Sequence, residues 1–294
     1  MVAFMSAADI RYEVLPLGKS EEQAAQLPEP VRLTVTCSPK HGPDHSVQVG
    51  GRLKALGHAV TVHVAARMVR DRAHLDALLS GMRDAGIDDL FLIGGDADPP
   101  AGSFTSAVEL LPVIAEHADR PGTIGIGGYP EGHPLITPAT LDQALTEKSR
   151  HADYITTQLC FDADTLRRWV VSVRERGIDL PVLIGMPGKV TPAKLLEMSA
   201  RIGVGPSMSF VRKQSGVGKL LALFRRSAPD RLYDALAPEL GDAGLGIAGL
   251  HYFTFNQLVA TYEWHRDKHQ PSGDRPAAGE RAAAGYVRAE ETRT

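Results

Sequence analysis

Several features that define specialised classes of protein are scarce or absent in this 294-residue chain. It contains two cysteines, Cys37 and Cys160, too few for a secreted disulfide scaffold, and no CxxC pair indicates zinc. No apolar run reaches the roughly 20 residues of a membrane-spanning helix. The N-terminal residues have no basic segment and no long apolar run, so a signal peptide is not predicted. These absences favour a cytoplasmic location.

The chain also has little excess of either positive or negative charge. The formal net charge is −3, which gives no electrostatic reason to expect a nucleic acid or an anionic membrane as a partner. An α/β barrel takes about 250 residues. We therefore expect one barrel domain over residues 1–268. The remaining residues, 269–294, are rich in Pro, Gly, Ala and charge, which predicts a disordered tail without a catalytic role.

Eight short apolar runs recur along the chain, and most are continuous rather than alternating. Continuous runs of this length are typical of strands buried on both faces, as in a parallel sheet. The runs are Ile10–Leu15, Val31–Thr36, Ala59–Val64, Leu90–Ile93, Thr123–Ile126, Tyr154–Gln158, Pro181–Ile184 and Ile247–Thr254.

Helical patterns lie between these runs. Asp71–Ala85 and Thr165–Arg176 each carry one apolar stripe, and each is followed by a glycine that can end a helix, Gly86 and Gly177. Both units continue as Gly-Ile-Asp and then an apolar strand, which indicates a repeated helix–strand unit. Eight such strands predict an α/β fold, a single (β/α)8 TIM barrel, although a doubly wound sheet would give a similar pattern.

In a barrel the active site forms where the strands end, so polar residues at those positions are candidates. Glu13 lies inside an apolar strand, and apolar surroundings favour the protonated form of a carboxyl group, as a general acid requires. Asp96 follows Gly94 and Gly95, which would let the backbone approach a planar or phosphorylated ligand. The simpler interpretations are an exposed strand residue for Glu13 and a turn for Asp96.

Further candidates end the other runs. His63 stands near the end of the third run, and no second ligand stands beside it at a metal-binding spacing, so no metal is predicted. The Tyr129–Pro134 loop holds a tyrosine and His133, each next to a proline, a rigid setting for contacts with a ring, phosphate or ribose. The amide of Gln158 offers a donor and an acceptor to a heterocycle. The simpler interpretations are a structural role for His63 and for Gln158, and a structured Tyr129–Pro134 loop that binds no ligand. Cys160 lies in an apolar context typical of a buried, unreactive thiol.

Taken in order, the strings GGYPEGHP, ADYITTQLCFD and GLHYFTFNQ resemble the methylenetetrahydrofolate reductase family. IDDLFLIGGD and RYEVLPL are similar to two further strands of that family. The resemblance runs from about residue 12 to residue 264. It implies a (β/α)8 barrel that binds FAD and passes hydride from NADH or NADPH to 5,10-methylenetetrahydrofolate, giving 5-methyltetrahydrofolate.

The resemblance also implies roles for individual residues. Glu13 looks like the acid that protonates folate N10 and opens the ring to an iminium, and Asp96 looks like the carboxylate near flavin and pterin. The substrate contacts implied are Gln158, Phe210, Tyr252 and Asn256. The flavin contacts implied are Thr36, His63, Gly95, Asp96, Tyr129, His133 and Lys148.

Three departures from the family pattern concern the flavin. Gly94 stands where the family has an arginine, and Gln257 stands where it has another. On the helix after the His-Pro motif, Lys148 is the clear cation in place of a polar and basic cluster. Each missing arginine removes charge-assisted hydrogen bonds worth about 1.5–3 kcal/mol. FAD stays the expected cofactor, with direct hydride transfer from the nicotinamide as the alternative.

Two other functions fit the same residues. A divergent family member could reduce another iminium or one-carbon substrate, and a folate- or flavin-binding module could lack turnover altogether. A buried acid such as Glu13 has no purpose in a simple binder, which favours an enzyme. Barrels of this type often self-associate, so a homo-oligomer is compatible with the chain, but the sequence shows no interface signature.

Overall fold

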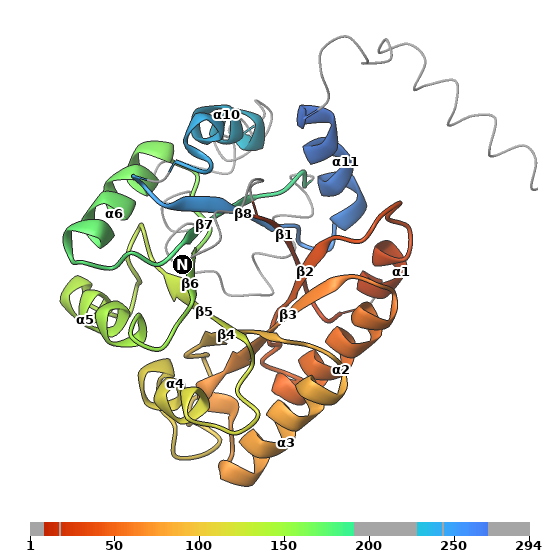
Figure 1. Cartoon of the computed structure of the whole chain (residues 1–294), viewed down its shortest axis with the longest axis vertical. Helices are drawn as coiled ribbons and strands as arrows, with labels where there is room; N and C mark the ends of the chain where they lie inside the picture. The colour runs from red at the N-terminus through yellow and green to blue at the C-terminus, as the bar shows by residue number, and fades with distance from the viewer. Residues whose placement is uncertain (1–8, 18, 191–227, 243, 270–294) are drawn as a thin grey trace, which may run out of the picture.

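A computed structural model describes residues 9–17, 19–190, 228–242 and 244–269. Within these ranges eight parallel strands pair in chain order and close into a barrel, with helices around the outside (Figure 1). The strands are β1 (Asp9–Val14), β2 (Arg32–Val35), β3 (Ala59–Ala65), β4 (Asp89–Ile93), β5 (Thr123–Gly128), β6 (Tyr154–Thr157), β7 (Val182–Pro187) and β8 (Ile247–Phe253). All eight predicted strands, and the predicted barrel, are confirmed.

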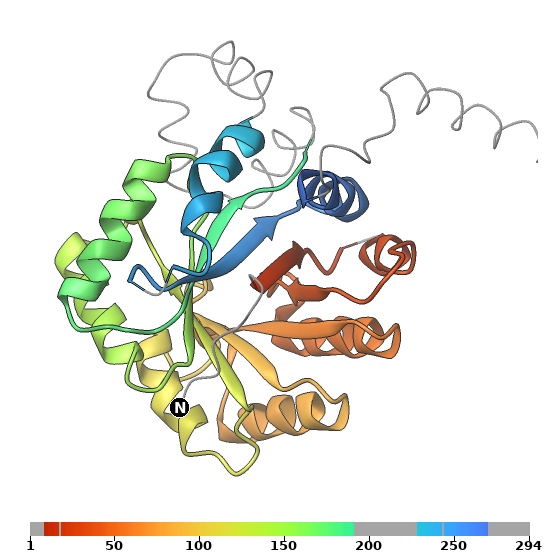
Figure 2. The same ribbon diagram turned by 45° about the horizontal axis from the view of Figure 1, so that its top comes forward.

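The helices follow the strands and cover the barrel from outside (Figure 2). They are α1 (Ser20–Ala24), α2 (Gly42–Ala55), α3 (Arg72–Asp84), α4 (Ala107–Ala115), α5 (Pro138–Lys148), α6 (Ala163–Glu175), α10 (Ala228–Leu236) and α11 (Leu258–His269). Two 3-10 turns, η1 (Ala66–Met68) and η2 (Ala237–Glu239), complete the order. No helix in the described ranges is long and apolar enough to cross a membrane.

The two helices predicted from the sequence begin and end for local reasons. The side chains of Asp71 and Asp162 each accept the backbone N–H three residues further on, which satisfies a free donor at the helix start. Gly86 and Gly177 follow the helix ends with φ of 68° and 73°, a conformation that glycine adopts without strain. Both predicted helix stops are confirmed.

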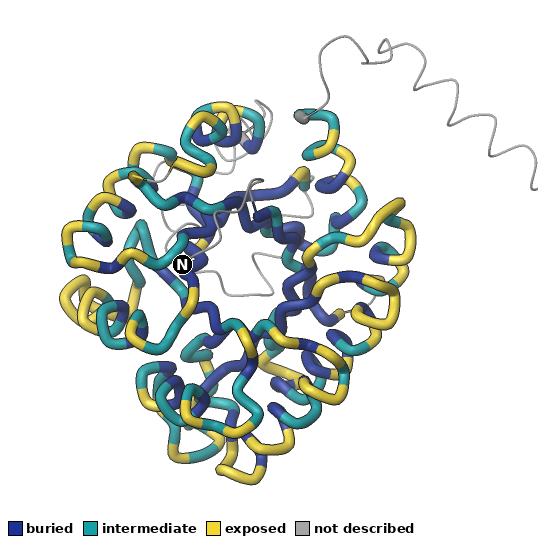
Figure 3. The backbone as a smooth tube through the Cα atoms, in the orientation of Figure 1, coloured by how far each residue is buried: buried dark blue, intermediate teal, exposed yellow. Residues whose placement is uncertain are grey.

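Strand alternation decides which side chains face the inside of the barrel. Tyr12 on β1 packs outward, with its ring centroid 6.2 Å from that of Tyr262 on α11. Its neighbours Arg11 and Glu13 therefore point inward. Figure 3 shows the strands as a buried ring, while the exposed residues lie mainly on the outer sides of the helices. The barrel interior thus divides into a half near the strand starts and a half near the strand ends.

Candidate active site

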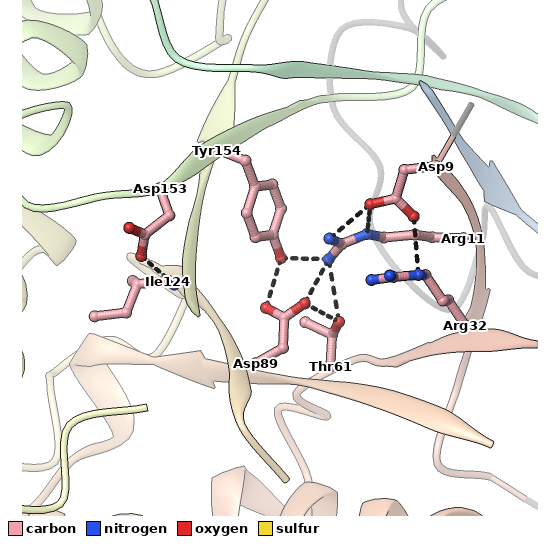
Figure 4. Close-up of polar contacts among 8 residues, drawn as sticks. All are labelled: Asp9, Arg11, Arg32, Thr61, Asp89, Ile124, Asp153 and Tyr154. Carbon is pink, nitrogen blue, oxygen red and sulfur yellow. Dashed lines mark hydrogen bonds and ion pairs between the residues drawn. The ribbon is translucent and has the colours of Figure 1, made fainter. Parts of the chain in front are cut away.

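The half of the interior near the strand starts, here called the lower half, is filled by a polar network (Figure 4). Arg11 Nη1 donates to Asp89 Oδ2 at 2.7 Å and to the Tyr154 hydroxyl at 2.8 Å. Thr61 Oγ1 and the Tyr154 hydroxyl donate to the two oxygens of Asp89, at 2.8 and 3.0 Å. Asp9 accepts two hydrogen bonds from Arg11. These groups bond mainly to one another, which indicates a structural role.

Glu13 lies one inward position above Arg11, in the upper half of the interior. Its carboxylate Oε2 is 3.3 Å from His251 Nε2 on β8, and the two side chains are 13% and 3% exposed. Its backbone oxygen accepts from the Thr254 hydroxyl at 2.5 Å. The predicted acid is therefore inside the barrel, near the end of its strand, beside a histidine.

His63 occupies the same half, on β3. Burial, with the neighbouring His251 as a second cause, lowers the pKa of His63 to about 3. Its ring centroid lies 4.7 Å from that of Phe91, with the two planes tilted by 36°, and its Nε2 is buried with no hydrogen-bond partner among the described residues. The imidazole is therefore neutral, with one nitrogen left available to a ligand.

The ends of β4 and β5 bring a second group of predicted residues to the mouth. Asp96 is exposed. Burial of the Tyr129 hydroxyl, together with the negative charge of Asp96, raises the pKa of Tyr129. The ring of His133 meets the ring of Tyr129 edge-on, with centroids 5.5 Å apart. Gly95 has a φ of 82°, and a Cβ there would lie 2.8 Å from the Cβ of Ala65. The strands approach too closely at this point for a side chain.

Lys148 is in the last turn of α5, and its ammonium donates to the Gly127 carbonyl at 3.3 Å. Burial lowers its pKa to about 8. Thr36 directly follows β2, and its backbone N–H bonds the end of β1 at Val14. The Lys148 ammonium therefore lies beside the last residues of β5, the strand that leads into the Tyr129 loop.

Gln158 and Asn256 also lie at strand ends. Gln158 is exposed, and its side-chain oxygen accepts the N–H of Leu159 at 2.7 Å. Asn256 holds the segment after β1, because its oxygen accepts from Leu15 N–H and its amide donates to the carbonyls of Leu15 and Leu17. Asn256 therefore has a bracing role in addition to any contact with a substrate.

Tyr252 does not face the interior, in contrast to what the last-strand motif suggested. Its side chain is fully buried against α11, and its hydroxyl lies 2.8 Å from His265 Nδ1. The reason is register, since Glu13 pairs with Phe253 and Arg11 pairs with His251 across β1 and β8. His251 and Phe253 are thus the inward residues of β8. Phe210 lies outside the described residues.

His251 is the main site residue that the sequence analysis missed. Period-two alternation along β8 was the available signal, but it needs the register with β1 before it can be used. The predicted burial of Cys160 is confirmed, since its side chain is fully buried, and burial raises the pKa of its thiol to about 12. In the described ranges no group of three His, Cys, Asp or Glu side chains could hold a metal ion.

A (β/α)8 barrel that brings Glu13, His63 and His251 together in the half of its interior near the strand ends has the layout of a barrel enzyme. A family model described as methylenetetrahydrofolate reductase matches residues 45–266, three quarters of the chain. The chain therefore belongs to the methylenetetrahydrofolate reductase family.

Three named relatives show how far the likeness extends. Methylenetetrahydrofolate reductase 1 of Schizosaccharomyces pombe is 30% identical over 126 residues, 38% of this chain and 20% of that protein. Methylenetetrahydrofolate reductase 2 of Saccharomyces cerevisiae is 25% identical over 193 residues, covering 62% and 32%. Methylenetetrahydrofolate reductase (NADH) 1 of Arabidopsis thaliana is 31% identical over 133 residues, covering 38% and 22%. The matched region spans a fifth to a third of these relatives.

Proposed function

We propose that the chain reduces 5,10-methylenetetrahydrofolate to 5-methyltetrahydrofolate with NADH or NADPH as the reductant. The observation that carries the proposal is the carboxyl group of Glu13, held inside the upper half of the barrel in a chain of this family. At 13% exposure it is shielded from bulk water yet close to the open end of the barrel. A carboxyl group at this place can deliver a proton to a ligand bound at the open end.

In the proposed reaction Glu13 gives its proton to N10 of the folate. The bond between N10 and the bridging carbon breaks, which leaves an iminium between that carbon and N5. A hydride from the nicotinamide then reduces this carbon to the methyl group. The sum is substrate, NAD(P)H and one proton giving product and NAD(P)+, and Glu13 recovers its proton from solvent.

Asp96 and Gln158 are proposed to orient the pterin. Both are exposed at the ends of their strands, β4 and β6, so they can be reached from the mouth. The Gln158 amide can pair with the edge of a heterocycle, although its oxygen already accepts the Leu159 N–H and only part of its bonding capacity is free. Phe210 and Asn256 remain proposed substrate contacts from the family resemblance.

The described residues offer a flavin two features that fit. The unpartnered Nε2 of His63 can bond a polar edge of the ring system, and the space beyond Gly94 is open, with no atom within 4 Å of a Cβ built there. Thr36, Gly95, Tyr129 and His133 would border the group, and Lys148 would meet its diphosphate. When bound, FAD would accept hydride from the nicotinamide and pass it to the folate.

A reaction without flavin is the second candidate, and a specific feature favours it. Among the residues proposed to hold FAD, Lys148 is the one with a basic side chain, and its ammonium already bonds the Gly127 carbonyl. With Gly94 and Gln257 in place of arginines, the diphosphate would receive few charge-assisted hydrogen bonds. The nicotinamide would then deliver its hydride directly, and the role of Glu13 would be unchanged.

The experiment combines two measurements on the purified chain. Chromatography follows the conversion of methylenetetrahydrofolate to 5-methyltetrahydrofolate while NADH and NADPH oxidation is recorded; no product with either nucleotide would refute the proposal. Absorbance during titration with FAD then decides between the two candidates. Bound flavin that NADH bleaches and the folate restores supports the flavin route, and turnover in a colourless protein supports direct transfer.

A further inference from the structure

The Glu13 carboxylate has one hydrogen-bond partner among the described residues, and that partner is His251. Within the same ranges the other ionisable groups on the inner face are already engaged or neutral. Five belong to the lower network, where they bond or pair with one another: Asp9, Arg11, Arg32, Asp89 and Tyr154. The sixth is His63, whose pKa is lowered to about 3 by burial and by His251. Among the described residues, His251 is therefore the side chain that can orient the Glu13 carboxyl group.

Which nitrogen of His251 carries the proton follows from burial. Nδ1 is buried and has no hydrogen-bond partner among the described residues. A proton on it would be a buried donor without an acceptor, at a cost of about 1–3 kcal/mol. A proton on Nε2 instead points at Glu13 Oε2, 3.3 Å away. The favoured tautomer thus carries its N–H toward the carboxyl group.

The ring of His251 is held in place by its neighbours. Phe253 packs edge-on against it with centroids 5.1 Å apart, and the histidine side chain is 3% exposed. Phe253 has room because residue 185 is a glycine, where a Cβ would lie 2.9 Å from the Phe253 ring and 2.1 Å from the Thr157 carbonyl oxygen. The donor direction is therefore fixed before any ligand arrives.

We propose that His251 is a positioning residue for Glu13. Its Nε2–H donates a hydrogen bond to Oε2 of Glu13, so that the proton for transfer resides on Oε1 of the same carboxyl group. A carboxyl group can hold its proton on either oxygen, and only one of them can address the substrate. The hydrogen bond from Nε2–H to Oε2 keeps the proton off the oxygen that cannot reach the substrate, and it fixes the plane of the carboxyl group. This inference rests on the proposed function, because the transfer itself is part of that reaction.

Two substitutions separate positioning from packing. His251→Phe keeps an aromatic ring and removes the donor, so kcat should fall about 10²-fold, as expected when a reacting group is misplaced, with little change in the folate KM. Because a donated N–H favours the charged carboxylate, the loss of activity on the alkaline side should also move to higher pH. His251→Gln keeps an N–H donor and should restore most of kcat and the original pH profile.

The matched control is His58, another buried histidine with a bonding role. It accepts from Val31 N–H, and its Nε2 contacts the Ala24 carbonyl. His58→Phe should lower the melting temperature and leave the pH profile of kcat unchanged. A folded His251→Phe with normal kcat and pH profile would overturn the proposal, as would a folded His251→Gln as impaired as the Phe variant.

A measurement that needs no turnover keeps the test decisive if a variant does not fold. In protein labelled with 15N-histidine, NMR should show a proton on Nε2 of His251, and Glu13→Gln should shift that Nε2 signal. A proton on Nδ1, or an unmoved signal, refutes the inference. If the wild type makes no product but shows the predicted spectrum, the proposed function fails while the contact between the two residues stands.

Discussion

The two halves of the barrel interior differ in how fully their polar groups are satisfied. In the lower half Arg11, Thr61, Asp89 and Tyr154 supply donors and acceptors to one another. Near Glu13 three buried atoms have no hydrogen-bond partner among the described residues: Thr34 Oγ1, His63 Nε2 and His251 Nδ1. In the lower half Asp9 Oδ1 also lacks a hydrogen bond among these residues, but it lies 3.4 Å from the Arg32 guanidinium, an ion-pair partner. Buried polar groups in native proteins are normally bonded, so unused capacity at the strand ends points to ligand binding.

A single strand contributes to both halves. β1 supplies Asp9 and Arg11 to the lower network and Glu13 to the upper site, with Tyr12 between them packed outward. If the division is functional, substitutions on this one strand should separate stability from activity. The following predictions test that separation, beginning with the largest expected effect.

Glu13→Gln should lower turnover by about 10²–10⁴-fold, the usual contribution of a general acid. The amide keeps the shape of the side chain, so the free energy of unfolding should change by less than about 1 kcal/mol. Steady-state kinetics and urea unfolding measure the two effects. Glu22→Gln, on the exposed surface of α1, is the control. Turnover that survives in Glu13→Gln would remove the acid role.

Arg11→Met should give the opposite result in the lower half. Removing the guanidinium leaves Asp9 and Asp89 buried without their cation, and loss of one partner of a buried ion pair costs about 3–5 kcal/mol. Urea unfolding measures the loss. Arg32 also pairs with Asp9, at 3.4 Å, but is 51% exposed, so Arg32→Met should cost much less. Equal costs for the two variants would contradict the prediction.

Gly94→Arg should strengthen the binding of FAD at the mouth of the barrel. A Cβ at this position meets no atom within 4 Å, so the fold should accept the side chain. One added charge-assisted interaction with a diphosphate is worth about 1.5–3 kcal/mol, which corresponds to about 10- to 150-fold tighter FAD binding. Flavin fluorescence titration measures the affinity, and Gly94→Gln separates charge from bulk. Equal affinities for wild type and both variants would argue against flavin phosphates at this loop.

His63→Gln should flatten the acid side of the stability curve. Burial lowers the pKa of His63 to about 3 from its ordinary 6.5, so the unfolded chain takes up this proton first as the pH falls. Folding stability is therefore present above pH 6.5 and lost toward about pH 3, by at most about 1.4 kcal/mol per pH unit. Unfolding series between about pH 4 and pH 6 measure the slope. His41→Gln, an exposed histidine, should leave the slope unchanged.

Local pattern was enough to predict the strands, and their number together with the family resemblance favoured the barrel over a doubly wound sheet. Continuous β-branched runs, helical stripes and the stop glycines Gly86 and Gly177 act over a few residues, so the sequence displays them directly. Glu13 could be chosen as a candidate for the same reason, because a lone carboxylate inside an apolar strand is visible without any partner. The family resemblance then predicted that Asp96, Gln158 and the Tyr129 loop lie at the same end of the barrel.

What only the tertiary structure decided is the pairing across strands. His251 and Glu13 are separated by 238 positions, and Arg11 and Tyr154 by 143, so no local signal joins them. The register of β1 against β8 chose His251 over Tyr252 as the inward residue, because one step along a strand moves a side chain to the opposite face. The sequence by itself determined the elements and the position of the candidate acid, Glu13; closure of the barrel determined the neighbours of that side chain.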